Sequence, residues 1–406
     1  MEKTADQRMM RRLNNQIVIN ILKNQGPLSR ANVSAISGLN RSTISAIIND
    51  LIDEGWVRET NLQSDRIGRP GMLLEINPAA GFAIGIEIGV DFVLVAVMDF
   101  SANVIWRKHI DTNPDEGQIT IQEKAFKITS EAIDIGKDHC LRPLGIGIAV
   151  PGLVDVHQGV LKFAPNLRWK DIPLRLIWTQ QFHIPVTIEN EANAAALGEY
   201  YYGAAKGIDD FIYIAAGYGL GSGIIIDGDL LRGNKGYASE VGHMTTDPNG
   251  ELCSCGKRGC YEIQIGPRAV IDRVNKLIAE EGERGTLLSA TQKSSNGFSY
   301  DVIVDAARKK DKVAVKALED VGCKLGVLVS NLVNIFDPKM VILGGALTYA
   351  GDFILPFVRK VVKENALKLC QEDLVITNSQ LDQDSSVMGA ASLILEYYWK
   401  ESGLPH

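Results

Sequence analysis

Residues 82–99 read FAIGIEIGVDFVLVAVMD, and this stretch decides the fold class. The runs 82–90 and 92–99 are almost wholly apolar, and a glycine-containing turn lies between them. Apolar runs of this length that are bounded by a turn are typical of paired, buried strands. The stretch therefore predicts a buried hairpin at the start of an α/β body.

The pattern repeats further along the chain. Strands are expected at 104–106 and 144–150, with a helix at 119–137 between them. A second set of strands is expected at 211–214 and 223–227. Two similar, glycine-rich strand–loop–strand openings predict a duplicated α/β architecture with a cleft between two lobes. A closing helix, about 386–398, is expected to pack back on the first lobe.

The 76 residues before this body have a different pattern. Helical spacing begins near Leu13 and stops at Gly26-Pro27. Ser29 fits the N-cap of a second helix that buries Val33 and Ile36.

A third helix begins at Asn40 or Ser42, and its apolar residues recur at i, i+3, i+4, i+7 and i+8 up to Gly55. Two strands follow at 56–58 and 72–76. Helix, helix, tight turn, helix and hairpin is the order of a winged helix-turn-helix domain.

The third helix carries a polar face suited to DNA. Small or hydrogen-bonding side chains of this kind reach base edges and phosphates when a helix lies in the major groove. Two arginines on the tip between the last two strands suit a narrow minor groove. The alternative is a three-helix module for protein contacts. The predicted DNA-binding residues are Arg41, Ser42, Thr43, Ser45, Asn49, Arg66 and Arg69.

Composition and charge bound the class of protein. The chain has 406 residues, 46% hydrophobic and 22% charged, as in a globular protein of two or three domains. Residues 1–76 hold ten Lys or Arg and eight Asp or Glu, a net charge of +2. Because the whole chain carries −7, the remaining residues carry −9. Since no apolar run is long enough for a membrane span and no secretory signal is visible, we expect a cytoplasmic protein without membrane contact.

A cysteine cluster predicts a metal site. Cys253, Cys255 and Cys260 fall within eight positions, and His243 lies ten residues before the first of them. One imidazole and three thiolates satisfy tetrahedral Zn²⁺ and leave no open position, so the role predicted for zinc is structural. A disulfide, which a reducing compartment disfavours, and a reactive thiol cluster are the alternatives.

At this point the chain resembles the repressor/ORF/kinase (ROK) family. The matching motifs are AVPGLVD at 149–155, IENEAN at 188–193, EVGH at 240–243 and CSCGKRGCYE at 253–262. Within the family it is most similar to bacterial xylose repressors, through GIEIGVD at 85–91 and APNLRWKD at 164–171. The resemblance implies an α/β, two-lobed, actin-like and ribonuclease-H-like sugar-kinase fold behind a winged helix-turn-helix.

The resemblance also implies a domain plan. The DNA-binding domain is expected at 1–78 and the first lobe at 79–190, completed by a C-terminal helix at 383–400. The second lobe, at 191–382, is expected to carry the zinc site and a surface for homodimerisation.

The sugar-binding residues implied by the resemblance are polar groups on glycine-flanked loops. Each sugar hydroxyl donates and accepts hydrogen bonds, so such a site needs carboxylates, amides and an imidazole. The implied residues are Asn166, Asn190, Glu191, Glu240, His243 and Glu262. His243 is expected to ligate zinc through one nitrogen and to face the sugar with the other.

The phosphate-binding motifs depart from those of the family's kinases at three places. Glu87, Val90 and Asp91 replace residues of an Asp-x-Gly-Gly-Thr loop, and Tyr218 replaces the threonine of a Gly-Thr-Gly loop. Glu191 stands where the catalytic aspartate would be, and the extra methylene displaces the general base. We therefore predict a protein that is not an enzyme and for which ATP is not an expected cofactor.

The predicted function is that of a sugar-responsive repressor whose partners are operator DNA and a small aldose. Xylose is the preferred effector and glucose the second candidate. Induction is the expected sign, and co-repression stays open. The competing interpretations are an ATP-dependent sugar kinase with a DNA-binding head, and a regulator whose body binds another protein.

Overall fold

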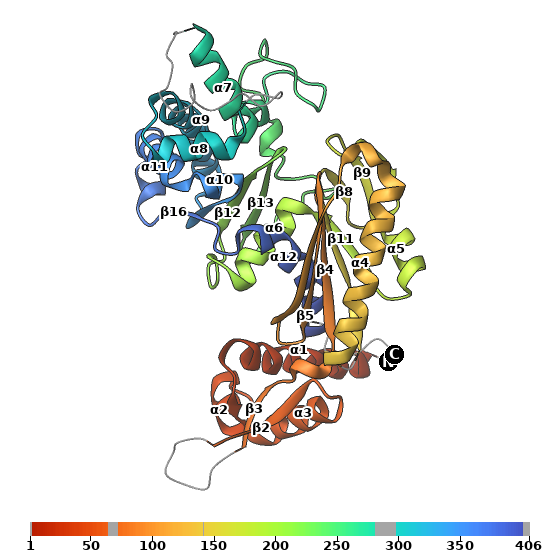
Figure 1. The fold of residues 1–406 in the computed structure, drawn as a ribbon. Helices are drawn as coiled ribbons and strands as arrows, with labels where there is room; N and C mark the ends of the chain where they lie inside the picture. The colour runs from red at the N-terminus through yellow and green to blue at the C-terminus, as the bar shows by residue number, and fades with distance from the viewer. Residues whose placement is uncertain (1, 64–71, 141, 281–297, 401–406) are drawn as a thin grey trace.

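The computed structural model describes residues 2–63, 72–140, 142–280 and 298–400. Figure 1 shows a small head at one end, a first lobe next to it and a second lobe at the far end. The elements therefore follow the predicted order, with a winged helix-turn-helix head before a two-lobed α/β body. Within the described residues, no helix is long and apolar enough to span a membrane.

The head consists of three helices and a small antiparallel sheet in the order β1-β3-β2. Its elements are α1 (Glu2–Gln25), β1 (Leu28–Ser29), α2 (Arg30–Ser37), α3 (Arg41–Asp53), β2 (Val57–Gln63) and β3 (Met72–Ile76). Helix α1 begins well before the apolar spacing that predicted it. Strand β1 is too short for any sequence pattern to indicate.

Side-chain caps set the starts of α2 and α3. The Ser29 hydroxyl accepts a hydrogen bond from the Asn32 amide, as predicted. Asn40, and not Ser42, caps α3 by accepting from the Thr43 amide at 2.8 Å. The predicted burial of Ile36 is wrong. The residue is 46% exposed, and Val33 is the buried residue of the short helix α2.

The first lobe is built on a five-stranded sheet in the order β11-β7-β4-β5-β6. The predicted hairpin forms its centre, with β4 antiparallel to β5 and parallel to β7. The strands are β4 (Phe82–Ile88), β5 (Phe92–Asp99), β6 (Val104–Asp111), β7 (Pro143–Val150) and β11 (Val186–Asn190). Helices α4 (Gly117–His139) and α5 (Leu174–Phe182) and a small sheet of β8 (Leu153–Asp155), β9 (Val160–Ala164) and β10 (Trp169–Ile172) complete it.

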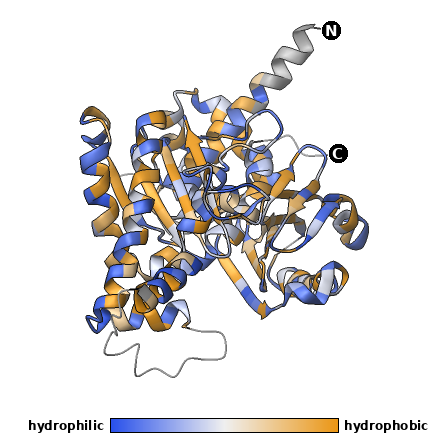
Figure 2. Ribbon diagram, turned by 90° about the horizontal axis from the view of Figure 1, so that it is seen from above, coloured by the Kyte–Doolittle hydropathy of each residue, from blue (hydrophilic) through white to orange (hydrophobic). Residues whose placement is uncertain are grey.

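The second lobe repeats this topology in the sheet β14-β13-β12-β15-β16. Its central strand is again antiparallel to the following strand and parallel to a later one, which confirms the duplication. The strands are β12 (Phe211–Ala216), β13 (Leu220–Ile226), β14 (Asp229–Leu230), β15 (Met340–Gly345) and β16 (Val375–Asn378). The helices are α7 (Pro267–Glu280), α8 (Tyr300–Arg308), α9 (Lys312–Phe336), α10 (Ala346–Tyr349) and α11 (Gly351–Asn365). Figure 2 shows the apolar residues concentrated on the strands of the body.

Helices α6 (Glu191–Tyr202) and α12 (Ser385–Lys400) lie between the two lobes (Figure 1). They touch at a glycine: a Cβ on Gly389 would lie 1.7 Å from the Ala194 carbonyl oxygen. Helix α12 lies equally close to the first sheet, where a Cβ on Gly147 would lie 1.8 Å from the Ala390 oxygen. Only glycine allows such backbone approaches.

The head and the first lobe share one hydrophobic core. The ring of Trp56 lies 4.6 Å from that of Phe100 in the body, measured between centroids. The ammonium of Lys23 lies 3.6 Å from the ring centroid of Trp399 on α12 and pairs with Glu396 at 3.0 Å. The head is thus packed onto the far end of α12, in addition to being joined by the chain.

Candidate functional site

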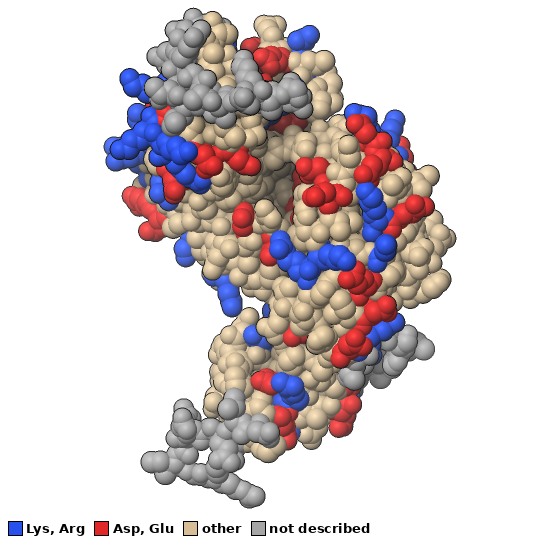
Figure 3. Space-filling model, in the orientation of Figure 1, with Lys and Arg blue, Asp and Glu red and all other residues tan. Residues whose placement is uncertain are grey.

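A cavity of about 1030 Å³ lies between the two lobes. In the space-filling view it is seen as a hollow in the middle of the body (Figure 3). All six residues that were expected to bind sugar line it, namely Asn166, Asn190, Glu191, Glu240, His243 and Glu262. The fold therefore brings together side chains that span almost 100 positions of the sequence.

Asn190 and Glu191 enter the cavity at the start of α6. The Asn190 oxygen caps the helix by accepting from the Ala192 and Asn193 amides, and its nitrogen donates to the Gly152 carbonyl at 3.0 Å. Much of this side chain is therefore occupied in holding the loop. Burial, reinforced by the nearby carboxylates of the second lobe, raises the pKa of Glu191 to about 7.

Glu240 and Glu262 line the cavity from the second lobe. Glu240 directly precedes the short helix η3 (Val241–His243), and Glu262 lies in the short helix η4 (Tyr261–Gln264). Burial, followed by the charge of Glu262, raises the pKa of Glu240 to about 7. Glu262 accepts hydrogen bonds from the Ser254 hydroxyl at 3.0 Å, the Cys253 thiol at 3.3 Å and the Leu220 amide at 3.3 Å. Near neutral pH, the carboxyl group of Glu240 therefore offers both a donor and acceptors to a ligand.

Glu87 is a cavity residue that sequence reasoning treated only as a departure from a phosphate loop. Burial and then the neighbouring Glu191 raise its pKa to about 8, so the carboxyl is largely neutral at pH 7. A single carboxyl inside an otherwise apolar strand was the available signal. Such a group must be paired or protonated when buried.

The turns that carry Asp91 and Tyr218, where departures from kinase motifs were expected, are joined to each other. Tyr218, at the turn between β12 and β13, donates a hydrogen bond at 3.1 Å to the carboxylate of Asp91, at the turn between β4 and β5. This bond links the second lobe to the first across the cavity mouth. A phenol and a carboxylate from different lobes are therefore in direct contact.

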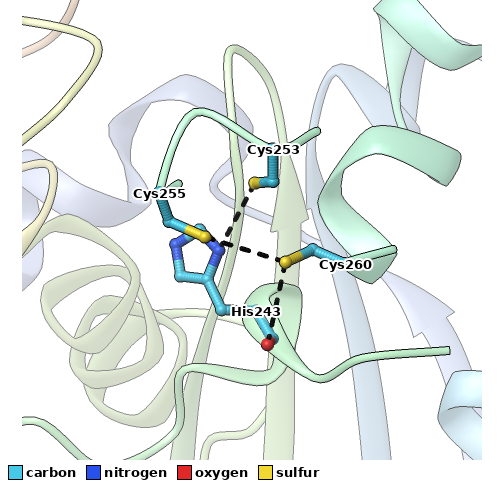
Figure 4. A group of neighbouring side chains, drawn as sticks. All are labelled: His243, Cys253, Cys255 and Cys260. Carbon is cyan, nitrogen blue, oxygen red and sulfur yellow. Dashed lines mark hydrogen bonds between the residues drawn. The ribbon is translucent and has the colours of Figure 1, made fainter. Parts of the chain in front are cut away.

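The cysteine cluster lies beside the cavity wall that Glu262 and His243 form. The ligand atoms of His243, Cys253, Cys255 and Cys260 all lie within 4.8 Å of one another. Figure 4 shows the three sulfurs and the imidazole pointing toward a common centre. Cys253 Sγ lies 3.8 Å from His243 Nδ1, and Cys255 Sγ lies 3.7 Å from Cys260 Sγ.

The donor set fits a metal ion. Two sulfurs on one tetrahedral zinc lie about 3.8 Å apart, since each Zn–S bond is about 2.3 Å long. Burial raises the pKa of the Cys253 thiol to about 12, whereas a bound dication would favour the thiolate. His243 takes part through Nδ1 and also lines the cavity, so its ring connects the cluster to the binding wall.

The polar face of α3 lies on the surface of the head. Arg41, Ser42 and Asn49 are exposed, and Thr43 and Ser45 are half-buried. Arg30, which sequence reasoning missed, donates to the Asn49 side chain at 2.8 Å and to the Ser45 carbonyl at 3.5 Å. The predicted Arg66 and Arg69 lie outside the described residues.

A two-lobed body with a polar cleft behind a winged head defines a class of ligand-binding regulators. Sequence comparison is specific: the ROK family pattern matches residues 83–397, and a winged helix-turn-helix DNA-binding pattern matches residues 13–58. The chain therefore belongs to the ROK family.

Relatives and solved structures agree with this placement. The chain is 34% identical to a putative xylose repressor of Caldicellulosiruptor over 95% of its length and 96% of the relative. It is 32% identical to the xylose repressor of Bacillus subtilis over 97% and 98% of the two chains. A ROK transcriptional regulator, a homologue of the Escherichia coli Mlc protein, superposes with a TM-score of 0.82 at 27% identity over 97% of each chain. A ROK glucokinase from Streptomyces griseus, crystallised with glucose and AMPPNP, gives 0.68 at 32% identity over 77% of this chain and 99% of its own.

Proposed function

We propose that this protein is a sugar-responsive transcriptional repressor of carbohydrate-utilisation genes. The observation that carries the proposal is that one chain holds an exposed recognition helix and a polar cleft, packed together through α12. The similarity to named xylose repressors over nearly the whole length of both chains supports it.

The proposed effector is a small aldose, with xylose preferred and glucose second. The carboxyl groups of Glu191 and Glu240, with pKa values near 7, match hydroxyls that both donate and accept. Asn166, Glu262 and His243 complete the wall that is proposed to contact the sugar. The names of the relatives support xylose over glucose.

The cleft is proposed to bind without phosphorylating. Asp91 brings a negative charge where a nucleotide's phosphates would lie, and Tyr218 fills the facing turn. The kinase interpretation keeps some support from the glucokinase superposition, but that likeness leaves out the head. A body that binds another protein is less favoured, because all six sugar-facing residues line one cavity.

Zinc is the proposed structural metal, held by His243, Cys253, Cys255 and Cys260. Its proposed role is to fix the loop that carries Glu262 and the ring of His243, since a ligand's other contacts depend on the metal that orients it. The proposed domains are residues 1–78, 79–190 with 383–400, and 191–382, the last of which is proposed to carry the dimerisation surface. Two copies would place their α3 helices in successive major grooves.

The test of the function measures operator binding by the full-length protein at rising sugar concentration. The DNA probe is a duplex that the protein itself selects from a random-sequence library. D-xylose is expected to release the duplex at lower concentration than D-glucose, with L-glucose as the inert control. No effect of any aldose would reject the sensor, and tighter DNA binding would reverse its sign.

A coupled ADP-release assay with the same sugars and MgATP tests the kinase alternative. We expect no turnover above the rate of a sample without sugar. Sustained, sugar-dependent turnover would place the chain among the family's kinases.

A further inference from the structure

Glu199 is a buried carboxyl that neither the sugar wall nor the metal cluster uses. It lies near the C-terminal end of α6 and is 0% exposed. One oxygen accepts from the hydroxyls of Ser379 and Ser385 and from the Leu381 amide at 3.0 Å. The other accepts from the Ala204 amide at 2.8 Å and the Gln380 amide at 3.3 Å. Five neutral donors therefore converge on one side chain.

Four of these donors belong to a single segment, residues 379–385. This segment joins β16, the last strand of the second lobe, to α12, which packs on the sheet of the first lobe. Helix α6 makes the other connection, since it follows β11 of the first lobe and leads to β12 of the second. Glu199 thus ties together the two passages of the chain between the lobes.

The same two helices lead to the two sites. Glu191, two turns before Glu199 on α6, lines the sugar cavity. Ser385 is the first residue of α12, and Trp399 near the other end contacts Phe100 and Lys23 of the shared head core. A change in the angle between the lobes therefore acts on α12 at the point where Glu199 holds it.

We propose that Glu199 is a positioning residue that fixes the two interlobe connections to each other, so that movement of the lobes on a bound sugar is passed along α12 to the DNA-binding head. This inference rests on the function proposed above and adds the element that couples its two sites.

An ionised carboxylate suits this position because it accepts hydrogen bonds through two oxygens and has no hydrogen to place against a donor. Glutamine has the same size but replaces one accepting oxygen with an NH₂ group. In Glu199→Gln the new NH₂ group therefore faces other donors in either orientation of the amide. It faces the Ala204 and Gln380 amides in one orientation and the two serine hydroxyls in the other, and no cavity is opened.

The experiment uses the full-length protein with Glu199→Gln and, as a milder variant in case the first fails to fold, Ser385→Ala. Tyr200→Phe is the matched control, because it removes a hydrogen bond to Asp209 from the same helix and leaves segment 379–385 untouched. Hydrogen exchange is followed at the Gln380 and Leu381 amides. Binding of the library-selected duplex is measured with and without saturating D-xylose, and xylose affinity is measured by calorimetry.

We expect exchange at these two amides to rise about tenfold in Glu199→Gln. The ratio of duplex affinities without and with xylose should fall at least fivefold, while xylose affinity changes less than the ratio does. Ser385→Ala should show the same changes at smaller size, and Tyr200→Phe should match wild type.

The coupling role would be overturned if xylose releases DNA from the wild type and both variants keep the wild-type ratio of duplex affinities without and with xylose. Unchanged exchange would overturn the hold on the segment. A parallel loss of xylose affinity and ratio would assign Glu199 to the sugar site instead. If DNA binding by the wild type does not respond to any aldose, the proposed function fails and the coupling fails with it. The hydrogen-exchange result still tests whether Glu199 fixes segment 379–385.

Discussion

The two halves of the interlobe cavity differ in what holds their side chains. On the half that is proposed to face the sugar, Glu262 and His243 belong to loops that meet at the cysteine cluster. On the other half, two turns from different lobes meet through the hydrogen bond between Tyr218 and Asp91. Because separate elements build each half, a substitution in one half need not disturb the side chains of the other.

Removal of the proposed metal site is expected to have the largest effect on the difference between the two halves. Cys255→Ser takes away one proposed ligand, and a structural zinc contributes on the order of 10 kcal/mol to the fold that holds it. We expect zinc content to fall below one ion per chain and xylose binding to weaken at least about 100-fold. Elemental analysis and calorimetry measure the two effects.

Cys323→Ser is the control, since this thiol lies on α9 away from the cluster. It should keep wild-type metal content and affinity. Full xylose binding by metal-free Cys255→Ser would show that the wall stands without the cluster.

Glu87→Gln tests the buried carboxyl of the first lobe. Below about pH 4.5 the Glu87 carboxyl is neutral in both the folded and the unfolded chain. Between about pH 4.5 and pH 8 only the unfolded chain loses this proton. The free energy of unfolding of the wild type therefore falls as the pH rises through this range. The variant lacks this loss and should be more stable than wild type at pH 8 by about 4 kcal/mol. At pH 5 the difference should be less than about 1 kcal/mol.

Denaturant unfolding at a series of pH values measures the effect. Equal pH dependence in the two proteins would mean that Glu87 is ionised in the fold.

Glu191→Gln tests the proposed sugar contact at the start of α6. Replacing a carboxyl whose pKa is about 7 by an amide should cost about 1–3 kcal/mol, so xylose affinity should fall about 5- to 160-fold. Zinc content should stay intact, because Glu191 is not among the residues of the cluster. Calorimetry with elemental analysis provides both values, and exposed Glu131→Gln serves as control. Unchanged affinity would remove Glu191 from the site.

Tyr218→Phe has the smallest expected effect, because the hydrogen bond it removes is solvent-exposed and is worth about 1 kcal/mol or less. Xylose affinity should change less than about fivefold. The ADP-release assay should show no turnover, since the Asp91 carboxyl that is proposed to repel a nucleotide's phosphates is unchanged. Turnover in this variant would mean that the phenol alone blocks catalysis.

Sequence patterns predicted the elements that depend on neighbouring residues. The hairpin at 82–99, the Ser29 cap and the grouping of the three cysteines all follow from spacing within a few turns of chain. The wrong burial of Ile36 has a physical cause. Helical spacing identifies an apolar face but does not tell which part of that face a neighbour covers.

Long-range pairs were beyond the same reasoning. Tyr218 and Asp91 are 127 positions apart, and the carboxyl of Glu87 meets Glu191 only because two strands and a helix converge. Their proximity, and the pKa values that result from it, depend on how the lobes pack. The family resemblance named the sugar-facing residues, and the fold placed them around one cavity.

By itself, the sequence determined the winged head, the duplicated α/β body and the composition of the metal cluster, because hydrophobic period, caps and ligand spacing are local properties. Only the tertiary structure decided that Glu199 joins both interlobe connections and that α12 runs from the cavity to the core of the head. Those arrangements come from close backbone contacts at glycines and from buried hydrogen bonds, which exist only once distant segments have packed.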